Sequence, residues 1–239
     1  MRIAVVLVGI LLFSSYFLIA QVQEDIIKKH LKAIGGEKNW SRVKTMSTFG
    51  VRESGGDRIE ERRQMILNKA VRIDYKYISR DPATAQKKYF IVVFDNKGWK
   101  YMPDNRMDTV ELLSEQEVQY YKSENYFNDP FLHGELSQVR IEYLTKEIIN
   151  DREQFKFVIH YAKSKSAFIY LDAQTYLITK SISIENDSEI ELNYDEYKLL
   201  DKEIMIPHAI YSNYDGFSLK EVQLNPILSD EIFKPKALN

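Results

Sequence analysis

Alternation of apolar and polar residues dominates the chain after about residue 40. From Val71 to Tyr77 every second residue is apolar or aromatic, and every residue between is charged. The segments 155–161 and 190–195 repeat this pattern with few exceptions. A period of two is typical of antiparallel strands that bury one face and expose the other to water.

Turn signals divide the alternating segments into many short strands. Sequences rich in Gly, Asp and Asn stand at 54–56, 95–98 and 214–216. The further strand candidates are 44–51, 58–67, 88–95, 98–102, 139–149, 165–172, 176–184, 203–213 and 217–225. No repeat of fixed period recurs, which disfavours a propeller or solenoid. The pattern predicts a mainly β fold with few helices, in which about 11–12 strands form one strongly curved antiparallel sheet or incomplete barrel.

A short amphipathic helix is predicted before the strands. Between residues 24 and 34, Ile27, Leu31 and Ile34 recur at helical spacing, and the first turn is acidic. Gly35-Gly36 then provides a left-handed stop. One apolar stripe predicts that this helix lies on a sheet.

A second helical signal lies in the long insertion 104–135. Ser114 and Glu117 have the spacing of a capping box, and Leu113 and Val118 that of a hydrophobic staple. Long insertions with their own helix are often lids or binding elements. The insertion is either a movable lid, with Leu113, Val118 and Tyr121 facing the interior, or a permanent plug at the end of the barrel.

The first twenty residues have the features of an export signal. Arg2 precedes an apolar run from Ile3 to Phe13, and cleavage between Ala20 and Gln21 would follow. The alternative is an uncleaved inner-membrane anchor, because 18 residues of helix span about 27 Å against a hydrocarbon core of about 30 Å. The predicted organisation is a signal peptide over 1–20 and a single periplasmic domain over 21–239.

Composition excludes several kinds of chemistry. The 239 residues contain 33 Lys+Arg and 35 Asp+Glu, and this balance disfavours a nucleic-acid partner. The absence of cysteine excludes thiol nucleophiles, cysteine metal sites and the acylated cysteine of a lipoprotein. Four isolated histidines stand at His30, His133, His160 and His208, and no nucleophile-elbow or phosphate-loop motif occurs. No catalytic residue, metal or cofactor is therefore predicted, and an enzyme is the least favoured class.

Several motifs resemble one known family. The stretch 94–103 resembles a family hairpin in which an Asp-x-Lys turn is followed by Trp, an aromatic residue and Pro. The opening segment 25–46, the hairpin 170–178 and the closing segments 207–208 and 225–233 are also similar. Together they resemble the periplasmic outer-membrane lipoprotein-sorting carriers of LolA-like fold. That resemblance implies an incomplete barrel, a helical lid over an apolar concavity that holds acyl chains of lipid or lipoprotein, inner- and outer-membrane partners, and no enzymatic step.

Candidate walls of the concavity are the apolar residues of the predicted inward faces. They are Val71, Ile73, Tyr75, Phe90, Val92, Phe94, Trp99, Tyr101, Phe155, Phe157 and Ile159. The family often carries an Arg-Pro pair whose arginine latches the lid, but this chain has Leu67 and Asn68 there. Lys69 and Arg72 are the cations left as candidate latches.

Three classes of function therefore stay open. The favoured one is a carrier or binder of lipid or acylated protein. The second is a sensor or interaction module of the same fold, in which an open sheet edge such as 203–213 accepts a partner strand. An enzyme is the third, and it would need two converging titratable groups in a cleft.

Overall fold

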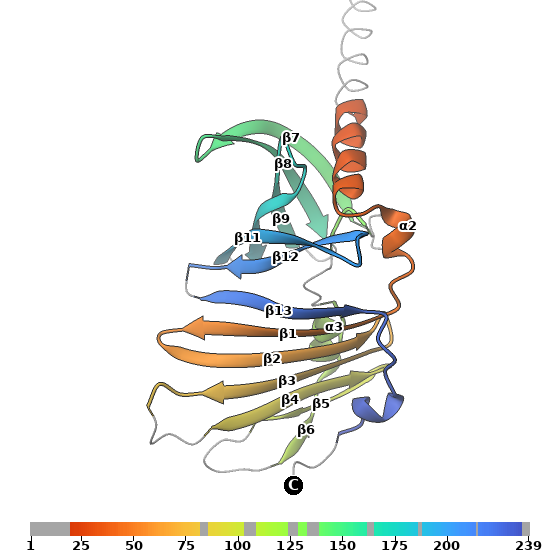
Figure 1. The fold of residues 1–239 in the computed structure, drawn as a ribbon, viewed down its shortest axis with the longest axis vertical. Coiled ribbons are helices and arrows are strands. Elements are labelled where there is room, and N and C mark those ends of the chain that lie inside the picture. The colour runs from red at the N-terminus through yellow and green to blue at the C-terminus, as the bar shows by residue number, and fades with distance from the viewer. Residues whose placement is uncertain are drawn as a thin grey trace, which may run out of the picture. The chain divides into compact units, whose positions relative to one another are not determined.

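The computed structural model describes residues 20–81, 86–102, 109–123, 129–132, 139–161, 165–185, 188–213 and 215–235. These residues form one antiparallel sheet of 13 strands, in the order β6-β5-β4-β3-β2-β1-β13-β12-β11-β10-β9-β8-β7 (Figure 1). The strands are β1 (Thr45–Ser54), β2 (Asp57–Ile66), β3 (Ala70–Ile78), β4 (Lys87–Phe94), β5 (Lys97–Tyr101), β6 (Val110–Leu112), β7 (Arg140–Ile149), β8 (Arg152–Tyr161), β9 (Lys165–Asp172), β10 (Ile178–Glu185), β11 (Ser188–Leu200), β12 (Ile204–Tyr211) and β13 (Gly216–Leu224). The helical elements are an N-terminal helix over 20–33, α2 (Glu37–Trp40), α3 (Glu115–Ser123) and the 3-10 turn η1 (Asp230–Phe233).

The strand pattern predicted from the sequence is confirmed, with one strand missed. Strand β6 lies inside the predicted insertion 104–135 and has only three residues, all of them exposed. A strand this short shows no detectable alternation. The sheet is not closed, because its order begins with β6 and ends with β7.

The prediction that 203–213 is an open edge is wrong. Strand β12 pairs with β11 on one side and with β13 on the other. Alternation shows that one face of a strand is exposed to solvent, but it does not show whether the strand is at the edge or in the centre of the sheet. The edges of the described sheet are β6 and β7.

The chain divides into two compact units. The first contains Met1–Glu37 and Asp129–Leu192, and the second contains Lys38–Asn128 and Asn193–Asn239. The predicted export signal, residues 1–20, lies outside the described residues except for its last one. No helix in the described ranges is long and apolar enough to cross a membrane.

The first unit packs the N-terminal helix on its strands, as predicted. The buried cluster consists of Ile26, Phe131, Phe157, Ile159, Ala167, Ile169 and Leu171. The helix ends at the predicted glycines, where Gly35 and Gly36 have φ of 111° and 84°. The N–H of Gly36 donates to the carbonyl of Leu31 at 2.7 Å, so the last turn is closed.

The second unit places different side chains on the two faces of strands β2–β5. Directly paired residues of antiparallel strands point to the same side, and sequence neighbours point to opposite sides. Helix α3 contacts β3, β4 and β5 and lies behind the sheet in Figure 1. The face that it covers, called the α3 face, contains Val71, Ile73, Tyr75, Ile91, Val93 and Gly98. The other side, called the charged face, contains Arg58, Glu60, Arg62, Arg72, Asp74, Lys76 and Lys88.

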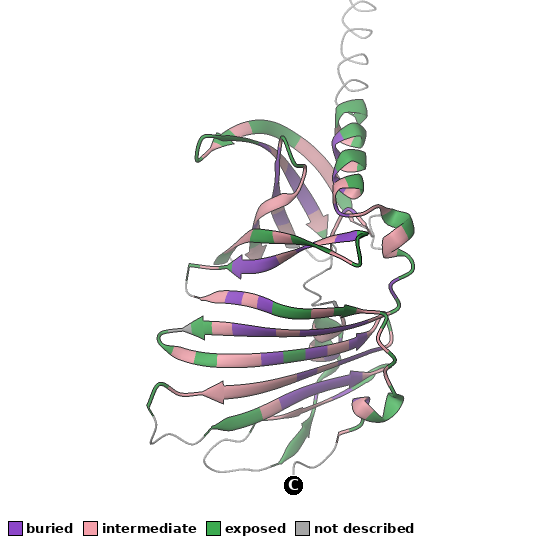
Figure 2. Cartoon of the chain, viewed as in Figure 1, coloured by how far each residue is buried: buried purple, intermediate pink, exposed green. Residues whose placement is uncertain are grey.

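Burial is greatest at one end of these strands. In Figure 2 the buried positions of β2, β3 and β4 gather toward the end near the β2–β3 turn, and Ile73 and Val93 have no exposed surface. One end of the charged face is covered by η1, where Phe233 packs with Ala70, Phe90 and Val92.

Candidate functional site

The start of α3 is fixed by the predicted capping box. The backbone N–H of Ser114 donates to Glu117 Oε2 at 2.8 Å, and the N–H of Glu117 donates to Ser114 Oγ at 3.3 Å. Lys100 Nζ, on the α3 face of β5, donates to Glu117 Oε1 at 2.9 Å. The Ser114 N–H above all, and then the side chains of Lys100 and Ser114, donate to the carboxylate and hold the pKa of Glu117 at about 2, below its ordinary 4.5. The capping box is therefore confirmed.

Helix α3 packs on the sheet at a glycine gap. A Cβ built on Gly98 would lie 2.6 Å from Leu113 Cδ1 and 3.1 Å from Val118 Cγ2. Leu113 and Val118 are buried, whereas Tyr121 is half-buried beside the exposed Tyr120. The sequence predicts Gly98 as the end of a turn, but it is a residue of β5 that lets the helix approach. Nothing in the local sequence shows this second use of a glycine.

The predicted wall residues do not share one surface. Val71, Ile73 and Tyr75 lie on the α3 face. The register places Phe90, Val92, Phe94, Trp99 and Tyr101 on the opposite side, where they pack with Phe233 and its neighbours. Phe155, Phe157 and Ile159 belong to the core of the first unit. A single lining made of all eleven residues therefore does not form in either unit.

The two candidate latch cations hold the C-terminal turn. Lys69 Nζ lies 2.9 Å from Asp230 Oδ2. Arg72 donates to Asp74 at 2.6 and 2.7 Å and to the carbonyl of Ile232 at 2.9 Å. The side chain of Arg72 is on the charged face, so it points away from α3. Its described partners fix η1 to the sheet.

His30, Asp129 and the carbonyl of Tyr176 form a buried polar contact in the first unit, here called the clasp. It was not predicted from the sequence. His30 has no exposed surface; its Nδ1 donates to the carbonyl of Tyr176 at 2.6 Å, and its Nε2 lies 2.8 Å from Asp129 Oδ2. Burial alone would lower the pKa of His30, but Asp129 and the Tyr176 carbonyl outweigh it, so the pKa is raised. Because both ring nitrogens face acceptors, the protonated ring satisfies both. The clasp ties the helix to the segment 129–132.

The N-terminal helix also covers part of the edge of β7. Gln23 Nε2 donates to the carbonyl of Ile141 at 3.1 Å, and the N–H of Tyr143 donates to Gln23 Oε1 at 2.8 Å. The side-chain amide thus occupies the place of a neighbouring strand. This contact protects part of an otherwise open edge.

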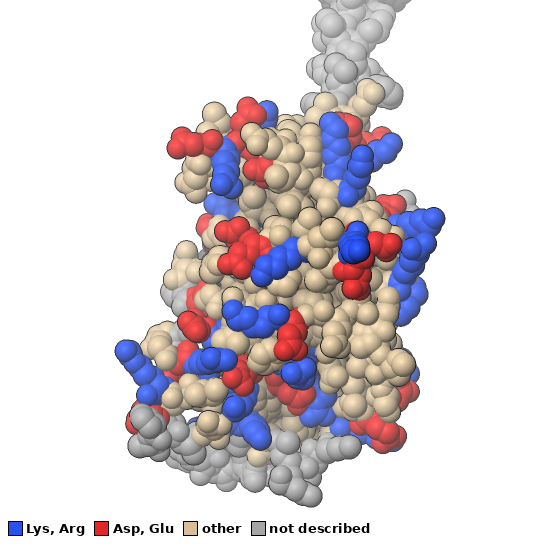
Figure 3. Space-filling view, viewed as in Figure 1, with Lys and Arg blue, Asp and Glu red and all other residues tan. Residues whose placement is uncertain are grey.

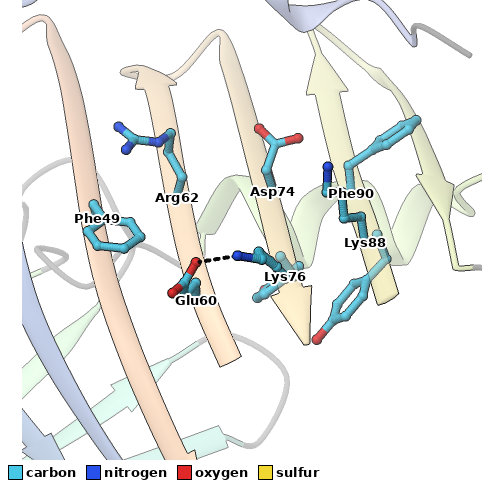
Figure 4. Close-up of a pocket in the computed structure, with 9 residues that line it drawn as sticks. Phe49, Glu60, Arg62, Asp74, Lys76, Lys88 and Phe90 are labelled. Atoms are coloured by element: carbon cyan, nitrogen blue, oxygen red, sulfur yellow. Dashed lines mark ion pairs between the residues drawn. The ribbon is translucent and has the colours of Figure 1, made fainter. Parts of the chain in front are cut away.

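A hollow of about 360 Å³ lies on the charged face (Figure 4). It is lined by Phe49, Glu60, Arg62, Asp74, Tyr75, Lys76, Lys88, Tyr89 and Phe90. Figure 3 shows Lys and Arg side chains between Asp and Glu side chains over this part of the sheet. The alternating pattern predicts that these charges form a solvated face, but it gives no sign of a depression.

The other described histidines have different partners. His160 contacts Ser166 and Glu142, and the buried His208 donates from Nδ1 to the carbonyl of Leu219 at 3.0 Å. His133 lies outside the described residues. Within the described ranges, no group of three or more His, Asp or Glu side chains is placed to hold a metal ion.

Comparison with known proteins shows a similar fold in several solved structures. No protein-family model matches the sequence, and no curated protein matches it. The structure is similar to a LolA superfamily protein from Nitrosomonas europaea, with a TM-score of 0.58 and 12% identity over 89% of this chain and 97% of that one. A DUF1329 family protein from Desulfovibrio piger has a TM-score of 0.57 and 12% identity over 88% and 96% of the two chains. A domain named for outer membrane lipoprotein sorting, from Vibrio parahaemolyticus, has a TM-score of 0.52 and 12% identity over 87% and 94%. At this identity the likeness describes the fold alone.

Proposed function

We propose that this chain, which has the LolA-like fold, is a non-enzymatic periplasmic carrier that holds acyl chains of a lipid or lipoprotein between α3 and the α3 face. Pick-up and delivery would involve partners at the inner and outer membranes. The observation that carries the proposal is the apolar packing of Leu113 and Val118 against Gly98.

The surface under α3 suits an acyl chain. Val71, Ile73, Ile91 and Val93 form adjacent apolar pairs on β3 and β4, and all are at most 4% exposed. Lifting α3 would uncover this strip and would separate Leu113 and Val118 from it. Each of those side chains contributes about 1.5–3 kcal/mol of burial. A bound hydrocarbon tail would supply similar contacts in their place.

The energetics permit transfer without a fuel. Removing a sixteen-carbon chain from water is worth roughly 12 kcal/mol before the cost of ordering the chain, so the free ligand would not stay in water. Relative to a bilayer the gain is near zero, because lipid tails and an apolar protein surface are similarly apolar. A protein in this balance can both take up and release a lipid.

A cysteine lock on α3 tests the proposal directly. Val118 Cγ2, the position a cysteine sulfur would take, lies 3.1 Å from a Cβ built on Gly98, which is within reach of a disulfide. In the Gly98→Cys/Val118→Cys variant, we expect uptake of a dansyl-labelled fatty acid in the reduced form and at least about tenfold weaker uptake after oxidation. Equal uptake in both redox states, with the disulfide verified by mass, would refute α3 as a lid.

The control is the Val118→Cys single variant under the same oxidant. The natural chain has no cysteine, so this variant cannot form an intramolecular disulfide, and its uptake should not change on oxidation. Mass spectrometry of lipids retained by the unmodified protein gives a second measurement. Bound acyl species support the carrier, whereas a consistently empty preparation supports an interaction module of the same fold.

A further inference from the structure

We propose that the hollow on the charged face binds the phosphate group of an organic molecule, with Lys76 and Lys88 as its principal ligands. This site lies on the opposite side of the sheet from the proposed acyl site. It does not depend on acyl binding.

The first argument is an unfavourable pairing in the sheet itself. Lys76 on β3 and Lys88 on β4 are direct cross-strand partners and point to the same side. Such partners have Cβ atoms about 4.5–5.5 Å apart, and like charges placed there destabilise the sheet. An anion between the two ammonium groups would convert this repulsion into attraction.

The second argument is that the nearby carboxylates are already engaged. Glu60 lies 3.1 Å from Arg58 Nη2 and 3.5 Å from Lys76 Nζ, so two cations share it (Figure 4). Asp74 accepts two hydrogen bonds from Arg72. No described carboxylate forms an ion pair with Lys88, which is exposed.

The third argument is the local excess of positive charge. On β2, β3 and β4 the charged face has five cations, Arg58, Arg62, Arg72, Lys76 and Lys88, against two carboxylates, Glu60 and Asp74. Arg62 lies over the ring of Phe49 at 5.2 Å and pairs with no described carboxylate. The whole chain is slightly acidic, with a net charge of -2, so this excess is a local feature.

The shape of the hollow favours a phosphate with an organic body. A phosphate has several acceptor oxygens, so two lysines on neighbouring strands can both donate to it. Phe49 and Phe90 lie at opposite sides of the hollow in Figure 4 and offer apolar contact to the rest of the molecule. A phospholipid headgroup and a soluble phosphate ester share this chemistry.

Titration calorimetry with glycerol 3-phosphate and with monomeric dihexanoyl phosphatidylglycerol tests the site. We expect saturable binding of at least one probe, weakened about tenfold or more by Lys88→Gln. Lys87→Gln is the matched control, because it removes the same charge from the adjacent position of β4, whose side chain is on the α3 face. The affinity of the Lys87→Gln variant for either probe should equal that of the natural chain.

The outcomes separate the possibilities. Binding of glycerol 3-phosphate identifies a soluble ester as sufficient, and binding of the lipid alone identifies a headgroup with its glyceride body. Flat titrations with both probes, or equal weakening by Lys87→Gln and Lys88→Gln, would overturn the proposal. Fatty-acid uptake should be unchanged in Lys88→Gln, so failure of this site is distinguishable from failure of the acyl proposal.

Discussion

The N-terminal helix of the first unit and α3 of the second both cover strands, but different contacts hold them. The N-terminal helix is fixed by partly buried hydrogen bonds, two from His30, whose side chain has no exposed surface, and two involving Gln23. Helix α3 has nine residues, and Val118, with Leu113 just before the helix, packs at Gly98. Its described polar contacts are the partly exposed Lys100–Glu117 pair and an exposed hydrogen bond from Lys122 Nζ to the carbonyl of Asp95 at 3.0 Å.

This difference indicates which helix can move. Breaking a buried polar contact leaves unsatisfied groups, so separation is costly. An apolar contact can be replaced by any other apolar body, including a hydrocarbon chain, with little net change. We therefore regard the N-terminal helix as structural and α3 as the exchangeable cover.

The largest expected effect comes from breaking the clasp. His30→Gln should lower the free energy of unfolding by about 3–5 kcal/mol, since it leaves the largely buried Asp129 without its cationic partner. Chemical denaturation measures the loss. The control is His160→Gln, at a site 43% exposed, which should change stability little. Equal stability of the His30→Gln variant and the natural chain would contradict the structural role of the clasp.

Filling the glycine gap should have a smaller, local effect. Gly98→Ala places a methyl group 2.6 Å from Leu113 Cδ1 and should cost about 1–3 kcal/mol. Hydrogen exchange should speed up in α3 and remain unchanged in the N-terminal helix. Adding Leu113→Ala relieves part of the clash, so the double variant should lose less than the sum of the two single losses. If the two losses in the free energy of unfolding add, the proposed packing of Leu113 on Gly98 is wrong.

The two buried histidines should give opposite pH dependence. The pKa of His30 is raised above 6.5, so its stabilisation is complete below pH 6.5 and is lost as pH rises through the folded-state pKa. Burial lowers the pKa of His208, although the Leu219 carbonyl opposes this, so its stabilisation is complete above pH 6.5 and is lost as pH falls. Each histidine changes the free energy of unfolding by at most about 1.4 kcal/mol per pH unit.

Unfolding at pH 5.5 and pH 8.5 checks these signs. The loss caused by His30→Gln should be greater at pH 5.5, and the loss caused by His208→Gln should be greater at pH 8.5. If both losses vary with pH in the same direction, the assigned protonation of one histidine is wrong.

The smallest expected effect is loss of the cap of α3. Ser114→Ala removes the hydroxyl that accepts from the Glu117 N–H and should cost about 1 kcal/mol. Hydrogen exchange in α3 reports the loss, and Ser114→Thr, which keeps a hydroxyl, should show less of it. Identical exchange in the Ala and Thr variants would show that the cap does not control the helix.

Much of the architecture was predictable because its signals are local. Alternation located twelve of the thirteen strands, and the stop at Gly35-Gly36 and the box of Ser114 and Glu117 were read from residues at most four positions apart. β6 was missed because three exposed residues give no pattern.

The candidate site was less predictable because it depends on pairing between strands. Reading inward faces strand by strand grouped Ile73 with Val92, yet the register pairs Ile73 with Ile91 and turns Val92 to the other side. A shift of one residue exchanges the two faces of a strand, and no single strand contains that information. The face of each wall residue therefore could not be assigned from alternation alone.

Local sequence thus determined where strands and helices begin and end, because capping, turn geometry and alternation act over a few residues. Tertiary structure alone decided that Gly98 receives α3, that His30 meets Asp129 across 99 positions, and that Lys76 stands opposite Lys88. These relations arise when distant segments are brought to contact distance, where register and burial set which charges and apolar groups face each other.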